Sequence, residues 1–485
     1  MPTAAPRRRG WRAGTARAAA AAPLLLLLAP LIAAPRPAAA AGEVDAIVIG
    51  AGVAGLKAAL DLATGGNSVT VLEARPRTGG RIHTLNDPRW GAVELGAQWI
   101  HGQPNVLTDL CKERGWKRLP SDLVGGVGYE ATSQTTAKEI TDAQWTAWEK
   151  LFSDLEERIE VLQEESSDGK NLAWGVKKFI REEDLTDSQI KGVDFMVNQE
   201  WVQEYAASTK RLSLNWFDND AEDLGGDSII ERGYSAVPDD LLSQARAKGV
   251  KVLLNQTVAE VDYSEGDSVV VTTTDGQAYT ASFAVVTLPL GVLQAKKRDG
   301  GVAFSPRLPS TKRRAIKNLK MGVLNKVILG FPDSAKWTQY NWVDRIPLPT
   351  DAGRWREFFS LRNITGKPLI VAFNAGDAAL YGDDPSDETL VADAVSALRA
   401  MFGADNIPDP DYSLVTRWHQ DPYTFGSYSV VAAGAKGTER KDLAAPVGKL
   451  LYFAGEAADV DYPSTVQGAW LSGAAAAKAA VLDHP

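Results

Sequence analysis

The feature that most constrains the fold is a strand–loop–helix–strand unit near the start of the chain. Val44–Ile49 is an apolar run typical of a buried parallel strand, and it leads directly into the glycine-rich loop Gly50–Gly55. Residues 56–63 follow a helical pattern, and Ser68–Leu72 predicts a second strand that ends at Glu73. A β-α-β unit of this kind predicts a parallel sheet and therefore an α/β fold.

The loop has the spacing of a dinucleotide-binding site. Gly50 permits the tight turn, Gly52 lets the backbone approach a pyrophosphate, and Gly55 lets the helix pack against the strand. The helix N-terminus offers N–H groups and the positive end of its dipole to the phosphates. Glu73 can accept hydrogen bonds from the adenosine ribose hydroxyls, and its charge would repel a 2′-phosphate, which argues against NADP.

The segment that follows favours FAD over NAD. It reads EARPRTGGR (73–81) and resembles the glutathione-reductase-type FAD fold that the flavin amine oxidases use. The resemblance matches that family's Gly-Gly-Arg to Gly79-Gly80-Arg81 and implies that Arg81 reaches the FAD pyrophosphate as a cation. Arg75 and Gly80 are expected in the same cofactor site.

The resemblance extends to the monoamine and polyamine oxidase family over residues 44–482. Its motifs occur in family order as ELGAQWIHG (94–102), NQTVAEVDY (255–263), TLPLGVLQ (287–294), MGVLNKVILGF (321–331), RWHQDPYTFGSYS (417–429) and LYFAGEAADVDYPSTVQGAWLSG (451–473). They imply further cofactor contacts at Ala97, Gln98, Val258, Trp418, Gly455, Glu456, Thr465 and Val466. The fourth motif carries the family's active-site lysine, Lys326, which the resemblance directs toward the flavin N5 through a water.

Two departures from the family refine the expected site. Monoamine oxidases have a cysteine that bonds the flavin just before the first tyrosine of an aromatic cage. In this chain Ser427 precedes Tyr428, so FAD is expected to bind noncovalently. Thr465 stands where the second cage tyrosine is expected, and the remaining half-cage resembles spermine and acetylpolyamine oxidases and histone lysine demethylases. His101 matches a histidine of animal-type polyamine oxidases, so the expected catalytic residues are Lys326, His101 and Tyr428.

The activity that the resemblance implies is FAD-dependent oxidation of spermine- or spermidine-type polyamines at a carbon next to a secondary amine nitrogen. Molecular oxygen is the acceptor, and the products are an aldehyde, a shorter amine and hydrogen peroxide. Three alternatives stay open: an L-amino-acid oxidase, a monoamine oxidase, or a non-catalytic binding protein on the same fold. An amino-acid oxidase needs a buried cation for the substrate carboxylate, for which Arg232 and Arg417 are candidates. Asp459 and Asp461 are candidates for binding a distal ammonium.

The pattern along the chain predicts two interlocked domains and a mixed α/β fold class. Segments 42–118, 226–310 and 416–485 are assigned to a Rossmann-like FAD-binding domain of the glutathione-reductase type. Segments 119–225 and 311–415 are assigned to a substrate-binding domain of mixed sheet and helices. Within the latter, Thr141 and Gln144 predict a capping box at the start of a long helix.

The first 41 residues have the layout of a secretory signal peptide. Arginines at 7, 8, 9, 12 and 17 precede an apolar stretch over 18–34, which small residues follow. Secretion is therefore expected, with a plastid transit peptide and a single anchoring helix as the alternatives. No other stretch is apolar enough to span a bilayer, so stable membrane insertion is not expected.

Composition narrows the partners and cofactors. The whole chain has a net charge of −9; its leader holds six Arg and no acid, which leaves 46 basic and 61 acidic residues, or −15. The negative charge of such a protein repels nucleic-acid phosphates, which argues against nucleic-acid binding, and can attract a cationic substrate. One cysteine, Cys111, and four scattered histidines exclude an intrachain disulfide and disfavour a metal site.

Overall fold

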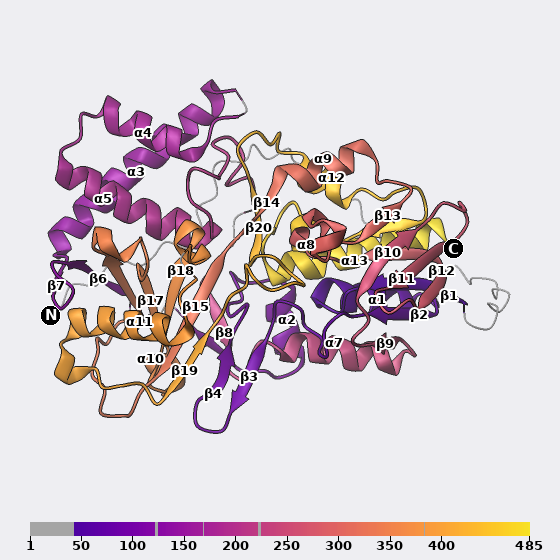
Figure 1. Cartoon of the computed structure of the whole chain (residues 1–485), viewed down its shortest axis with the longest axis horizontal. Coiled ribbons are helices and arrows are strands. Elements are labelled where there is room, and N and C mark those ends of the chain that lie inside the picture. Colours follow the sequence, from indigo (N-terminus) through magenta and orange to yellow (C-terminus); the bar gives the residue numbers. More distant parts are fainter. Residues whose placement is uncertain (1–42, 122–124, 168, 222–224, 383) are drawn as a thin grey trace.

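Two large sheets, three two-stranded pairs and a cluster of helices make up the described part of the chain, whose structure is a computed structural model (Figure 1). The structure describes residues 43–121, 125–167, 169–221, 225–382 and 384–485. The expected signal peptide at 1–41 lies outside the described residues. In the described ranges, no helix combines the length and the apolar character needed to cross a bilayer.

The eight-stranded sheet is built around the β-α-β unit. β1 (Glu43–Ile49) pairs in parallel with β2 (Val69–Leu72) on one side and with β12 (Ala278–Val286) on the other. The strand order is β13-β10-β11-β12-β1-β2-β9, and β21 also pairs with β12. The remaining strands are β9 (Lys251–Leu253), β10 (Val258–Asp262), β11 (Val269–Thr273), β13 (Ala303–Ser305) and β21 (Leu451–Phe453).

Both faces of this sheet are buried. Successive side chains of β1 point to opposite sides, so each face packs against its own set of helices. Ala46 and Val48 pack on one face against α1 (Val53–Thr64), α7 (Ala236–Ala247) and α13 (Val466–Asp483). Ile47 and Ile49 pack on the other face against α8 (Leu290–Gln294), α9 (Ser310–Asn318) and α12 (Glu439–Ala444). The continuous apolar run in the sequence follows from this double burial.

The first helix begins at Val53, three residues earlier than the periodicity predicts, so the loop and helix overlap. Gly50 has φ of +105°, a conformation that favours glycine. A Cβ at Gly55 would lie 1.9 Å from the carbonyl oxygen of Gly50, so this close approach requires glycine.

The second sheet has seven strands in the order β19-β15-β18-β17-β16-β6-β7. These are β6 (Gly126–Ala131), β7 (Ala137–Glu139), β15 (Leu324–Gly330), β16 (Trp342–Ile346), β17 (Glu357–Ser360), β18 (Leu369–Ala375) and β19 (Tyr412–Val415). α11 (Asp387–Phe402) covers one face, where Leu390 and Leu398 meet Val327 and Ile370. The lysine of the fourth motif lies on β15, which is the strand next to the β19 edge of this sheet.

A helical layer lies over one end of the second sheet (Figure 1). It contains α3 (Asp142–Glu165), α4 (Leu172–Glu182) and α5 (Asp187–Val197), and the capping box of Thr141 and Gln144 is present. A π-helix (Asn198–Val202) follows α5 directly and leads into the short α6 (Gln203–Tyr205). Such π-helical turns are frequent at functional sites.

Small paired strands connect the two sheets. β14 (Leu319–Gly322) pairs with β20 (Tyr428–Val431), which joins the segment at 311–415 to the C-terminal segment. The other pairs are β3 (Thr84–Asp87) with β4 (Gly91–Glu94), and β5 (Arg118–Pro120) with β8 (Ser228–Ile230). Two further short helices are α2 (Val106–Glu113) and α10 (Arg362–Thr365). The mixed α/β fold class is confirmed, and the exact domain boundaries stay a prediction.

Candidate active site

A large cavity runs from the glycine-rich loop of β1 and α1 to the helical layer. Its volume is about 1960 Å³, and its walls come from both sheets and from α3. Seventeen of the eighteen site residues expected from the sequence line it. The eighteenth, Gly55, lies behind the wall, where it holds α1 against the loop. Residues that are far apart in the sequence therefore meet at one space, while their individual roles stay predictions.

The end of the cavity at α1 fits the adenosine and pyrophosphate parts of a dinucleotide. Gly52 faces open space, and no side chain caps the N-terminus of α1, so its N–H groups are available to phosphates. The Glu73 carboxylate is buried and accepts hydrogen bonds from the backbone N–H groups of Ala51 (2.7 Å) and Arg75 (2.9 Å). This fixes the carboxylate beside the loop, where a ribose hydroxyl would reach it. The amide Nε2 of Gln98, further along the cavity, is buried and has no hydrogen-bond partner among the described residues.

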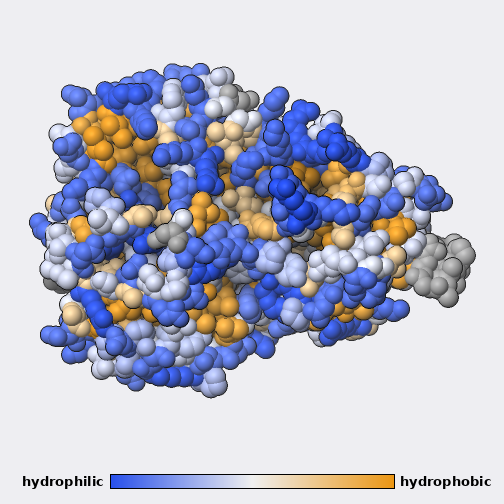
Figure 2. Space-filling view, viewed as in Figure 1, coloured by the Kyte–Doolittle hydropathy of each residue, from blue (hydrophilic) through white to orange (hydrophobic). Residues whose placement is uncertain are grey.

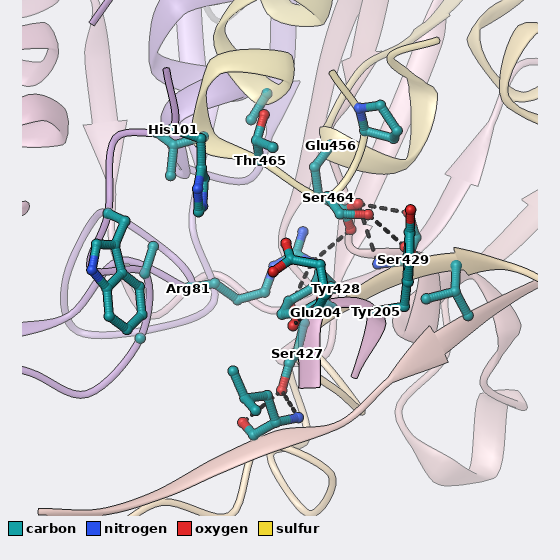
Figure 3. Close-up of a pocket in the computed structure, with 18 of the residues that line it drawn as sticks. Arg81, His101, Glu204, Tyr205, Ser427, Tyr428, Ser429, Glu456, Ser464 and Thr465 are labelled. Carbon is teal, nitrogen blue, oxygen red and sulfur yellow. Dashed lines mark hydrogen bonds and ion pairs between the residues drawn. The ribbon is translucent and has the colours of Figure 1, made fainter. Parts of the chain in front are cut away.

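A buried charge network lies at the middle of the cavity (Figure 3). Arg81 donates to Glu456 Oε1 at 2.7 Å, and Ser429 donates from its hydroxyl to Glu456 Oε2 at 2.6 Å. Arg440, on α12, donates to the same Ser429 hydroxyl at 2.7 Å. Burial raises the pKa of Glu456, but Arg81 and Arg440 outweigh it, so the net pKa lies below the ordinary value. Glu456 therefore stays ionised between two guanidinium groups.

Lys326 is almost fully buried on β15, with 4% of its surface exposed. Its ammonium donates to the carbonyl oxygens of Glu94 (3.1 Å) and Gly96 (2.8 Å) and to Oε1 of Gln98 (2.9 Å). The ring of Trp99 lies 5.7 Å from the ammonium. Burial lowers the pKa of Lys326 to about 8, although the Glu94 carboxylate opposes this shift. A buried ammonium with a lowered pKa at a cavity wall is a candidate for proton or charge chemistry.

Tyr428 presents its ring to the cavity from β20 and is held at its hydroxyl end. The hydroxyl donates to the carbonyl oxygen of Glu204 at 2.8 Å, on the short helix α6 (Figure 3). Burial and the nearby carboxylates raise the pKa of Tyr428 well above its ordinary value, so the phenol stays neutral. Ser427, before it, exchanges hydrogen bonds with the backbone of Leu324 at 2.8 and 3.0 Å. Thr465 caps α13 through its hydroxyl and adds no aromatic wall.

His101 forms a dyad with an acid that the sequence did not single out. Its Nδ1 lies 2.9 Å from the carboxylate of Asp227, which also accepts the backbone N–H of Gly102 at 3.2 Å. Burial raises the pKa of Asp227, but His101 and the Gly102 N–H lower it by a larger amount. The net pKa is therefore below the ordinary value. An ionised Asp227 orients the imidazole through Nδ1 and leaves Nε2 directed away from the acid.

The end of the cavity at the helical layer is strongly acidic. Its carboxylates are Glu149, Glu156, Glu160, Glu200, Glu204, Asp218, Asp220, Asp227, Asp344 and Glu357. Burial, and then repulsion from Asp218, raises the pKa of Asp220 to about 8. Burial likewise raises the pKa of Asp218 to about 6. Carboxylates crowded in this way are stabilised by a cation that enters between them.

Sequence reasoning missed Asp227, Arg440 and most of the acidic end. On a long helix such as α3, glutamates have the pattern of a solvated face, and nothing local distinguishes those that turn toward a cavity. The candidates Asp459 and Asp461 do not line the cavity, and neither do Arg232 and Arg417. Arg417 instead pairs with Asp387 at 2.8 Å.

The glycine-rich loop, the buried lysine and the cavity that joins them are features of a flavin-dependent enzyme that oxidises a small substrate. Comparison with known proteins gives the family. A profile for flavin containing amine oxidoreductases matches residues 53–481. The chain therefore belongs to this family, and it is a flavin amine oxidase for which the family implies FAD.

Three similar proteins illustrate the family's range. Polyamine oxidase 4 of Oryza sativa subsp. japonica is 33% identical, and the match covers 89% of this chain and 87% of that protein. Lysine-specific histone demethylase 1 homolog 3 of Arabidopsis thaliana is 32% identical over 89% of this chain but only 29% of its own length. A solved putrescine oxidase variant with redesigned cofactor binding has a TM-score of 0.72 at 19% identity, over 91% of this chain and 99% of that one. The last likeness supports the fold alone.

Proposed function

We propose that the protein is a polyamine oxidase that binds FAD noncovalently and oxidises spermine- or spermidine-type substrates. The observation that carries the proposal is the acidic end of the cavity, which begins beside Tyr428 and Glu204 and continues to α3. A polyamine has several ammonium groups along one flexible chain. The reacting nitrogen can then lie near Tyr428 and Lys326 while the distal ammonium groups meet carboxylates further along.

The side chains divide the work at the reacting end. FAD, when bound, accepts the hydride from the substrate and passes the electrons to oxygen. Asp227 holds His101 by Nδ1, which leaves the other ring nitrogen able to take a proton from the substrate ammonium. The ring of Tyr428 borders the amine, and Lys326 orders the water that hydrolyses the imine product. Amine, oxygen and water thus become aldehyde, shorter amine and hydrogen peroxide.

The amino-acid oxidase alternative loses its candidate residues, because Arg232 and Arg417 lie outside the cavity lining. Of the cations that do line it, Arg81 and Arg440 flank Glu456. A demethylase-like activity on methylated lysine peptides uses the same chemistry, and the substrate panel below includes it as an outcome. Secretion through residues 1–41 also stays part of the proposal.

Substrate preference is the direct test. We expect spermine and spermidine to have a higher kcat/KM than tyramine, benzylamine, amino acids and methylated lysine peptides, with products identified by mass. Glu204→Gln keeps the shape and removes one carboxylate from the acidic end, so we expect about a 10-fold loss of kcat/KM for spermine and little change for tyramine. Glu183→Gln, in an exposed position outside the cavity, is the matched control. A higher kcat/KM for tyramine or for a methylated peptide than for both polyamines contradicts the proposal.

The flavin attachment is tested separately. Ser427 has no thiol, and its hydroxyl is engaged by the backbone of Leu324, so nothing at this position can bond the flavin. We expect acid precipitation of the yellow protein to release all flavin into the supernatant, for the wild type and for Ser427→Ala alike. Flavin that stays with the washed pellet contradicts noncovalent binding, whatever the substrate proves to be.

A further inference from the structure

A basic surface region contrasts with the acidity of the rest of the chain. Residues 296–320 contain nine Lys or Arg and one acid, Asp299, whereas the whole chain has 52 basic and 61 acidic residues. Eight of the nine cations are exposed; we call them the basic ridge: Lys296, Lys297, Arg298, Arg307, Arg313, Arg314, Lys317 and Lys320. Figure 2 shows strongly hydrophilic side chains gathered over α8 and α9, where this segment lies.

The ninth cation explains why the others face outward. Lys312 is buried, and its ammonium donates to the carbonyl oxygens of Leu443 (2.6 Å) and Ala445 (2.5 Å) at the end of α12. Ala315 and Ile316 are buried on the same side of α9. The helix therefore lies flat against α12, with Arg313, Arg314 and Lys317 exposed to solvent.

Few carboxylates neutralise the ridge. Lys297 lies 3.6 Å from Glu260, and Arg298 lies 3.5 Å from Asp299, both in exposed positions. Among the residues that the structure describes, no carboxylate forms an ion pair with Arg307, Arg314 or Lys317. Burial and repulsion from Lys317 lower the pKa of Lys320, as expected for cations held close together. Exposed lysines Lys436 and Lys441, near and on α12, add to the positive charge beside α9.

The side chains of the basic ridge indicate which class of polyanion it can bind. The large hydrophobic side chains that are exposed in the described residues are Val161, Val460 and Leu482, and none belongs to the ridge. The ridge thus offers no apolar group to insert into a membrane and no exposed aromatic ring on which nucleic-acid bases could stack. Because α9 lies flat, it cannot enter a DNA groove as a projecting helix. A flexible chain that carries sulfate or carboxylate groups can follow such a surface through charge alone.

We propose that the basic ridge binds an anionic polysaccharide and so holds the enzyme on a polyanionic matrix. None of the ridge cations lines the cavity, so the proposal is independent of amine oxidation. The ridge would concentrate the enzyme where cationic polyamines also collect, because both are attracted to the same polymer.

The test uses FAD-loaded full-length protein and heparin as the probe. We expect the wild type to be retained at about 0.1 M salt and released as salt screens the charges. Arg307→Glu, Arg314→Glu and Lys317→Glu together should weaken binding at least about 100-fold. The matched control reverses three exposed cations elsewhere, Lys177→Glu, Arg181→Glu and Lys248→Glu, with the same net charge, and should bind nearly as the wild type does.

Three results overturn the proposal. The first is passage of the wild type through heparin without retention. The second is an equal loss of binding in the control variant, which would assign retention to net charge alone. The third is equal or tighter binding to double-stranded DNA or to phosphatidylserine vesicles than to heparin. The corresponding Gln substitutions at Arg307, Arg314 and Lys317 repeat the comparison if the Glu variant does not fold, and amine turnover confirms an intact enzyme.

Discussion

Lys326→Met is expected to slow one half of the catalytic cycle by about 10- to 1000-fold while leaving the protein folded and loaded with FAD. Methionine keeps the apolar stem and removes an ammonium whose hydrogen bonds go to neutral oxygens: two backbone carbonyls and the Gln98 amide. Removing that charge withdraws a group that can stabilise negative charge developing on oxygen or order the hydrolytic water. Anaerobic stopped-flow reduction, and reoxidation measured separately, identify the half that suffers.

Stability should not fall in this variant. The pKa of Lys326 is about 8 in the folded protein and ordinary in the unfolded chain, so the charged form is disfavoured by folding. That penalty is fully present below pH 8 and is relieved as pH rises from about 8 toward the ordinary lysine value. Removing the ammonium therefore leaves the unfolding free energy unchanged or raises it at neutral pH.

A second buried lysine provides the control. Lys312 is as buried as Lys326 but binds the end of α12, away from the cavity. Lys312→Met likewise removes a buried ammonium with three oxygen acceptors, and its pKa is lowered by burial to about 7, so its effect on stability should be similar to that of Lys326→Met, but both half-reactions should be unchanged. If Lys326→Met retains FAD and matches the wild type in both half-reactions, the centre of the active site has been misplaced.

The wild-type pH profile gives a further readout. Lys326 carries its charge below its pKa of about 8, so the half-reaction that needs the ammonium should slow as pH rises through that region. The same half-reaction in Lys326→Met should show no such fall. An identical pH profile in both proteins would mean that another group titrates.

The parts of the fold that sequence predicts well are those whose chemistry is local. The turn at Gly50, the close approach at Gly55 and the acid at Glu73 lie within one β-α-β unit, so spacing alone specifies their relation. The same holds for the capping box of Thr141, which needs only its own helix. The mixed α/β fold class follows from such units, and the structure confirms it.

The parts that sequence misses depend on contacts between distant segments. Asp227 meets His101 across 126 positions, and Arg440 reaches Ser429 only because α12 packs against the turn that carries Glu456. Glu204, on the short helix α6, is exposed like a surface glutamate in the sequence pattern, yet it lines the cavity. No local pattern encodes these relations, since each arises when the two sheets come together.

The Arg81–Glu456–Ser429–Arg440 network yields the second large prediction. Glu456→Gln is nearly isosteric, but it leaves two guanidinium groups near one another without the carboxylate that separates them. Breaking a buried ion pair by removing one partner costs about 3–5 kcal/mol, so we expect an unfolding free energy lower by about that amount at neutral pH. Denaturant unfolding of the FAD-loaded wild type and variant measures the difference.

The difference should depend on pH in a defined direction. The pKa of Glu456 is lowered in the folded protein, so its contribution to stability is present above the ordinary glutamate pKa and is lost as pH falls through the lower, folded-state value. The gap between wild type and Glu456→Gln should therefore be constant at neutral pH and shrink only in acid. A gap that closes near pH 7 would instead point to the Asp220 carboxyl, whose pKa is about 8.

A double-mutant cycle separates the network from a simple loss of packing. Arg440→Met alone leaves Glu456 paired with Arg81. Glu456→Gln alone leaves Arg440 without that carboxylate, but in the double variant the Arg440 guanidinium is absent as well. If the four groups act as one unit, the double variant loses less stability than the sum of the single losses, by about 0.5–3 kcal/mol. Strictly additive losses, or a Glu456→Gln protein as stable as the wild type at neutral pH, would mean that the carboxylate does not hold the two arginines together. Losses that are not additive would show that Glu456 couples Arg81, near the glycine-rich loop, to Arg440 on α12. Arg440 in turn lies near Asp220 at the acidic end of the cavity.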